Sequence, residues 1–301
     1  MSYNIIIEHI NKEQPVRSQI KAVKVVSTGS VAIHPEHVEG ARAPLFWWLL
    51  TSKRWTAPRP INVYVIEHEQ GLVLFDTGQD RASVTDANYF PKGIIGWLYG
   101  RLAKFAINPD ETLTALLRRI GYDVADVKLV ILSHLHQDHI GGLRELTNAE
   151  ILVSRAEWQS LQQYDAVMQG LMRNHIDLPN LKWRYIDFEL PSTEQVDGFT
   201  LSVDIFEDGS LVLLPTPGHT PGSMSLLVRR EGKTPLLMVG DLTYDVELMK
   251  QERVPGVGKK QGLRQATKAV NAVSDTYPDL VVLPAHDPGA ADRLNTAEGR
   301  E

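Results

Sequence analysis

Residues 134–139 read His-Leu-His-Gln-Asp-His, so four side chains that bind metals lie within six positions. The segment follows the apolar run at residues 127–133, which is typical of a buried strand. On extended backbone, side chains two positions apart point the same way, so His134 and His136 can bind one metal ion together. Asp138 and His139 come after the chain begins to turn and can face a second ion. This spacing predicts a site for zinc, or for iron, cobalt, nickel or manganese.

Packing alone gives no reason to place three histidines and one aspartate within residues 134–139. A lone histidine beside a strand is usually structural or exposed, but a buried cluster without a metal would lose its water and gain no partner. Gly141 and Gly142 follow and permit the tight turn and close backbone approach that such a site needs.

Three more candidate ligands follow apolar runs later in the chain. They are His219, Asp241 and His286, which follow residues 211–214, 235–240 and 280–285. Taken singly, they could be a loop histidine, a helix N-cap and a surface histidine. Because sites are commonly built on loops at the ends of rigid strands, their shared position favours one joint site.

The seven candidates divide into two groups. We expect one ion to be held by His134, His136 and His219, and another by Asp138, His139 and His286. Asp241 has two oxygens and can bridge both ions. Two divalent metal ions with room for a shared water form a hydrolytic site, and zinc lowers the pKa of a bound water to about 7.

Asp76 ends another apolar run. It is either a turn carboxylate or, in our interpretation, the residue that orients a ligand imidazole or the ligand loop.

Composition narrows the class of protein. The chain has 301 residues, a net charge of −6 and no basic run, which argues against a nucleic-acid partner. It has no cysteine, which excludes disulfides and thiolate ligands and fits a reducing compartment. Residues 1–9 lack the pattern of a signal peptide, so we expect a cytoplasmic protein. The apolar patch at residues 45–50 is too short to span a membrane.

The pattern of apolar runs predicts an α/β (α+β) fold. Residues 61–66 and 72–75 are expected to form one hairpin, and residues 223–228 and 236–239 another. Helices are expected at residues 111–120, from about 143, at 155–170 and at 262–275; further strands are expected at 151–153, 199–206, 211–214 and 280–283. We predict one domain over residues 1–301, built as a four-layer αβ/βα sandwich of two facing sheets with helices outside.

Taken together, these candidate residues resemble the motifs of a known family. Asp76, the block at 134–139, His219, Asp241 and His286 resemble the metallo-β-lactamase superfamily over residues 20–290. The resemblance implies a dinuclear site along one edge of the sheets. The absence of cysteine sets the chain apart from the cysteine-dependent β-lactamases of this fold.

One further residue indicates which group within the superfamily the chain resembles. Tyr244 lies three positions after Asp241, as in the N-acyl homoserine lactone lactonases, where a tyrosine contacts the substrate carbonyl. A phenol beside a bridging ligand can donate a hydrogen bond to a developing oxyanion, although a merely packed tyrosine is the alternative. The resemblance also implies that Asp138 carries a proton to the leaving alkoxide. The insertion at about 35–60, before Asp76, is similar to that group and is expected to form a lid or a dimer contact.

The sequence allows two roles for two segments that are rich in aromatic residues. They contain Phe46, Trp47, Trp48 and Trp97, which form either core or homodimer surface, or a wall for the acyl chain of a substrate. The remaining histidines show no readable pattern, and we expect them to be structural or exposed; they are His9, His34, His37, His68 and His175.

The seven candidate ligands predict a metal-dependent hydrolase, and the family resemblance implies that it opens the lactone ring of N-acyl homoserine lactones, the reaction of quorum quenching. The first alternative is a hydrolase of phosphotriesters or aryl esters on the same scaffold. An iron-dependent oxidoreductase and a non-catalytic metal-binding module are further alternatives.

Overall fold

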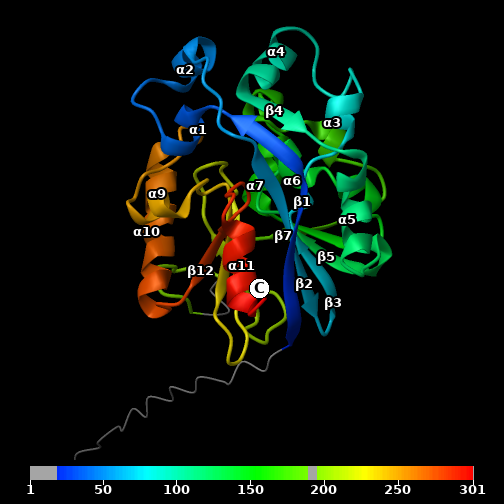
Figure 1. Ribbon diagram of the computed structural model, residues 1–301, viewed down its shortest axis with the longest axis vertical. Coiled ribbons are helices and arrows are strands. Elements are labelled where there is room, and N and C mark those ends of the chain that lie inside the picture. The colour runs from blue at the N-terminus through cyan, green and yellow to red at the C-terminus, as the bar shows by residue number, and fades with distance from the viewer. Residues whose placement is uncertain (1–18, 189–194, 301) are drawn as a thin grey trace, which may run out of the picture.

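Two β-sheets face each other at the centre of the molecule, with helices on their outer faces (Figure 1). The structure is a computed structural model that describes residues 19–188 and 195–300. The expectations for residues 1–9, including His9, fall outside this range. Of the helices in the described range, none combines the length and the apolar character that crossing a membrane requires.

The first sheet has seven strands. Their order is β4 (Ala103–Ala106), β1 (Ile20–Ile33), β2 (Arg59–His68), β3 (Gly71–Phe75), β5 (Val127–Ile131), β6 (Glu150–Ser154) and β7 (Lys182–Ile186). The strands from β3 to β7 run parallel, and the pairs on the other side of β3 are antiparallel. The predicted hairpin at residues 61–66 and 72–75 is therefore confirmed as β2 and β3.

The second sheet has five strands. Their order is β12 (Val281–Pro284), β11 (Leu236–Gly240), β10 (Met224–Val228), β9 (Leu211–Pro215) and β8 (Val203–Asp204). Only β11 and β12 are parallel neighbours. The second predicted hairpin is confirmed as β10 and β11.

Three apolar clusters hold the layers together. Between the sheets, Phe75 and Ile131 of the first sheet share one buried cluster with Leu226 and Met238 of the second. Outside them, α5 (Leu113–Arg119) packs on the first sheet and α10 (Lys260–Thr276) on the second, on opposite flanks of the molecule in Figure 1. Because apolar burial stabilises by about 25 cal/mol per Å², these faces dominate the stability of the fold. The expected αβ/βα sandwich is confirmed.

The other α-helices are short and lie around this frame. They are α1 (Pro35–Glu39), α2 (Leu45–Thr51), α3 (Ala82–Thr85), α4 (Gly93–Leu102), α6 (Gln137–Ile140), α7 (Arg155–Leu161), α8 (Arg173–Ile176), α9 (Val246–Lys250) and α11 (Ala290–Glu298).

Three predicted elements are shorter than expected. The helix from about 143 is a single 3₁₀ turn, and the helix at 155–170 ends at Leu161, with a separate 3₁₀ turn before Gly170. Of the strand at 199–206, only Val203 and Asp204 form a strand, which pairs with β9, and Phe199 makes an isolated bridge with Val196. The carboxylate of Asp204 accepts hydrogen bonds from the backbone N–H groups of Phe206 and Gly209, which turns the chain away from the sheet.

Candidate metal centre and substrate cavity

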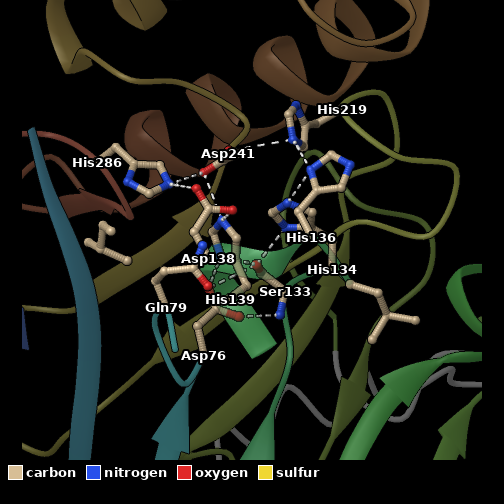
Figure 2. A network of polar contacts seen from close by, with 12 residues as sticks. Asp76, Gln79, Ser133, His134, His136, Asp138, His139, His219, Asp241 and His286 are labelled. Carbon is tan, nitrogen blue, oxygen red and sulfur yellow. Dashed lines mark hydrogen bonds and ion pairs between the residues drawn. The ribbon is translucent and has the colours of Figure 1, made fainter. Parts of the chain in front are cut away.

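The ends of four strands bring all seven predicted ligands into one cluster (Figure 2). The 134–139 block follows β5, His219 follows β9, Asp241 follows β11 and His286 follows β12. In Figure 2, His286 and His219 lie on opposite sides of Asp241. All but His136 and Asp138 are buried.

Three imidazole nitrogens meet in the first group of the cluster. His136 Nδ1 lies 3.0 Å from His134 Nε2 and 2.9 Å from His219 Nε2. A tetrahedral zinc ion with Zn–N bonds of about 2.0–2.1 Å separates its ligand nitrogens by about 3.3 Å, so the spacing is close to that of a metal site.

The outer nitrogens of two of these rings show which inner nitrogens are bare. His136 Nε2 donates to the carbonyl oxygen of Gln169 at 2.9 Å, which leaves the inward Nδ1 without a proton in the neutral ring. His134 Nδ1 donates to Ser133 Oγ at 3.0 Å, because that hydroxyl donates in turn to Asp76. Two bare lone pairs 3.0 Å apart repel each other, and a cation between them removes the repulsion. The donor set therefore fits a divalent metal ion.

The second group combines carboxylates and imidazoles. His286 Nε2 lies 3.4 Å from Asp138 Oδ2 and 3.4 Å from Asp241 Oδ1, and His139 Nε2 also lies 3.4 Å from Asp241 Oδ1. The other oxygen of Asp241, Oδ2, lies 3.4 Å from His219 Nε2 in the first group. His139 Nε2, His286 Nε2 and Asp241 Oδ1 are buried without a hydrogen-bond partner, which a shared cation would provide.

Asp76 lies directly behind this cluster. Its Oδ2 accepts hydrogen bonds from His139 Nδ1 at 2.8 Å and Ser133 Oγ at 2.9 Å, and its Oδ1 accepts one from the backbone N–H of Ser133 at 2.7 Å. The outer nitrogen of His286 similarly donates to the carbonyl oxygen of Pro60 at 2.9 Å. These bonds keep the Nε2 atoms of both rings directed into the cluster.

Burial and neighbouring charges set the protonation of the cluster. Burial, followed by the neighbouring His139 and His136 rings, holds the pKa of His134 well below its ordinary value, and burial does the same for the pKa of His219. Burial opposes ionisation of Asp241, but His286 and His139 outweigh it and hold the Asp241 pKa well below its ordinary value. Burial likewise opposes protonation of His139, but Asp76 and Asp241 outweigh it and raise the His139 pKa. A metal must displace that proton, so its binding weakens in acid.

A buried carboxylate ties two ligand loops together. Glu157 of α7 accepts hydrogen bonds from the backbone N–H of Leu135 at 3.0 Å, from Thr220 Oγ1 at 2.7 Å and from the backbone N–H of Gly222 at 3.0 Å. Leu135 separates His134 from His136, and Thr220 follows His219. Glu157 therefore fixes the spacing of the three imidazoles in the first group.

Replacing Glu157 with Ala is expected to lower the free energy of unfolding by about 3 kcal/mol or more, because three donors lose their acceptor and each costs about 1–3 kcal/mol. Urea unfolding of the variant and of Glu247→Ala, an exposed glutamate on α9, measures the difference. The surface variant should stay within about 0.5 kcal/mol of the unchanged protein. Equal losses in the two variants would contradict the role given to Glu157.

A cavity of about 860 Å³ opens onto the cluster. Its lining includes His136, Asp138, His219, Asp241, Tyr244 and His286 from the cluster and its surroundings. Much of the remaining lining is apolar and includes Leu45, Phe46 and Leu49 of α2, Leu98 and Leu102 of α4, and Phe105 of β4. A substrate that spans this cavity has a polar group at the cluster and an apolar group at the helices.

Of the four aromatic residues considered for the acyl-chain wall, Phe46 lines the cavity, whereas Trp47, Trp48 and Trp97 do not. Helix α2 turns Trp48 inward against His37, where it is 3% exposed, and turns Trp47 outward, where it is 66% exposed. In the same way, the face of α4 that lines the cavity carries Leu98 and Leu102, and Trp97 is on the other face and 50% exposed.

One candidate functional residue was not predicted from the sequence. His37 of α1 lines the cavity, and its Nε2 lies 3.0 Å from the hydroxyl oxygen of Tyr244. Tyr244 is buried, and its hydroxyl donates to Asp241 Oδ2 at 2.5 Å. No pattern in the sequence points to His37, because it is 207 positions away from its partner and follows no apolar strand end.

Comparison with known sequences agrees with this geometry. The profile of the family described as the metallo-beta-lactamase superfamily matches residues 56–286. N-acyl homoserine lactonase AttM of Rhizobium radiobacter is 32% identical over 77% of this chain and 83% of its own length. An N-acyl homoserine lactonase of a Bacillus species is 32% identical over 66% of this chain and 70% of its own length.

Solved structures share the fold. An N-acyl homoserine lactone hydrolase with the product N-hexanoyl-L-homoserine bound at its catalytic metal centre has a TM-score of 0.71 and 23% identity, covering 90% of this chain and 94% of that one. The dizinc quorum-quenching lactonase AidC has a TM-score of 0.61 and 16% identity, covering 90% and 91%. From its sequence match and its fold, the chain belongs to the metallo-beta-lactamase superfamily.

Proposed function

We propose that this protein is a metal-dependent hydrolase that opens the lactone ring of N-acyl homoserine lactones. The observation that carries the proposal is the cluster of five imidazoles and two carboxylates beside a mostly apolar cavity. The named activity of the curated relatives supports the choice of substrate. A lactone ring at the cluster and an acyl chain along the apolar residues of α2, α4 and β4 match the two kinds of lining residue in the cavity.

The cluster is proposed to hold two divalent metal ions. His134, His136 and His219 surround one position, and Asp138, His139 and His286 surround the other. Asp241 has one oxygen toward each group, which supports its role as a bridge. Nitrogen and carboxylate ligands suit zinc, and iron, cobalt and manganese remain compatible with them. When bound, the ions supply Lewis acidity and a nucleophile at neutral pH.

Two residues are proposed to act on the substrate directly. Burial, followed by the neighbouring Asp241 carboxylate, raises the pKa of Tyr244 well above its ordinary value, so the phenol keeps its proton and can donate a hydrogen bond to the oxyanion that forms from the lactone carbonyl. Asp138 lines the cavity, where its carboxylate can take a proton from the attacking water and pass it to the ring oxygen as the ester bond breaks.

Helix α2, within the insertion at 35–60, contributes to the proposed acyl-chain wall. Phe46 and Leu49 face the cavity, whereas Trp47 and Leu50 are exposed on the same helix. The exposed residues make this segment the proposed contact in a homodimer, and its contribution to the lining of the cavity supports a role as lid. A single domain and a cytoplasmic location complete the proposal.

A substrate panel tests the function. Metal-loaded protein is expected to release protons from long-chain and short-chain N-acyl homoserine lactones, with a higher kcat/KM for the longer chain because it buries more apolar surface. The same sample is assayed on a paraoxon-like phosphotriester and an aryl ester, and its metal content is measured. Faster hydrolysis of the phosphotriester or the aryl ester than of any lactone would overturn the proposal in favour of the alternative hydrolases.

A further inference from the structure

His37 reaches the centre from an insertion that carries no metal ligand. It lies on α1, is 6% exposed, and its ring packs edge-on to Tyr244 with the ring centroids 4.9 Å apart. Its backbone carbonyl accepts a hydrogen bond from the N–H of Gly256 at 2.9 Å, which anchors α1 on the second half of the chain. On its other side, Tyr244 stacks on His286 at 5.7 Å. The phenol is thus held between two imidazoles.

The hydrogen bonds around the phenol have only one consistent arrangement of protons. Tyr244 has one hydroxyl proton, and the hydroxyl donates it to Asp241 Oδ2 across the 2.5 Å contact between the two oxygens. The bond between His37 and the phenol must then be donated by His37 Nε2–H. Burial lowers the pKa of His37 to about 4, so the ring is neutral at pH 7 and its Nδ1 is bare; Nδ1 has no partner.

We propose that His37 is a positioning residue for catalysis, which donates from Nε2 to the phenol oxygen of Tyr244 and so prepares the phenol to donate to the substrate. This inference rests on the proposed hydrolysis of lactones. When the phenol proton turns from Asp241 to the carbonyl oxygen of the substrate, the bond from His37 remains and holds the oxygen in place. A hydroxyl that accepts one hydrogen bond also becomes a stronger donor in the next.

A double-mutant cycle separates this role from simple packing. His37→Phe keeps a ring of similar size and removes the donor, and it is expected to lower kcat about tenfold with little change in KM, as for a bond that matters in the transition state. His37→Gln retains an N–H donor and is expected to recover most of the loss. In the Tyr244→Phe background, His37→Phe is expected to cost nothing further, because its partner is gone. A tenfold loss in that background as well would overturn the proposal.

A measurement on the unchanged protein covers the case in which a variant does not fold. The ¹⁵N shifts of the His37 ring at pH 7 are expected to show protonated Nε2 and bare Nδ1. A ring that is protonated at Nδ1 alone, or at both nitrogens, would overturn the proposal. These shifts require no substrate, whereas lactone hydrolysis by the unchanged protein in the same series reports on the proposed function itself.

Discussion

Replacing Asp241 with Asn is expected to lower kcat/KM for lactone hydrolysis about a thousandfold or more. The carboxylate has one oxygen toward each half of the cluster, and the amide is neutral and can ligate through only one atom. Metal ions contribute several kcal/mol of charge stabilisation in the transition state, and each 1.4 kcal/mol is a factor of ten in rate. The metal content per chain should fall together with the activity, and elemental analysis of the purified variant measures it.

The matched control is Asp279→Asn, which makes the same chemical change at an exposed position. It should retain full activity and full metal content. Circular dichroism of both variants shows whether the fold is kept. If Asp241→Asn retained a tenth or more of the activity, the bridging role of this residue would have to be abandoned.

Replacing Asp76 with Asn is expected to weaken metal binding by about 10–100-fold without unfolding the protein. The amide NH₂ would face the N–H on His139 Nδ1 if its oxygen keeps the bond from the backbone of Ser133. The His139 ring then has to move its proton to Nε2, the atom that faces Asp138 and Asp241, and a protonated nitrogen cannot bind a metal. Asn tolerates the backbone φ of 62° at this position.

Competition with a chelator measures the metal affinity, and excess metal should restore part of the activity. Asp76→Ala serves as the contrast, since it loses the hydrogen bonds and also places a residue with poor tolerance at positive φ. It should lower the free energy of unfolding more than Asp76→Asn does. Unchanged metal affinity in Asp76→Asn would show that Asp76 does not control the orientation of His139.

The sequence predicted the parts of the centre that follow from strand ends. Apolar runs that terminate in His or Asp were sufficient, because the ends of neighbouring strands meet at one edge of a sheet and the two sheets face each other. His219 and His286, which follow β9 and β12, could be assigned because they share this position after an apolar run with Asp241 and with the 134–139 block.

The residues behind and beside the ligands could not be found in this way. Glu157 occupies the first turn of a helix, where an acidic residue is common, and its three partners come from two distant loops. His37 depends on how α1 packs against Tyr244, a contact that no local pattern encodes. Similarly, residues 45–51 lack clear helical spacing because α2 is apolar on its cavity face and on part of its exposed face, so Trp47 could not be distinguished from Phe46.

The most direct test of the metal cluster is anomalous X-ray scattering from crystals of the metal-saturated protein. Two peaks are predicted, one within about 2.0–2.2 Å of ligand atoms of His134, His136 and His219, and one at the same distance from those of Asp138, His139 and His286. Asp241 should contact both. A single peak, or metal bound only outside this cluster, would contradict the two-metal centre on which the proposed reaction depends.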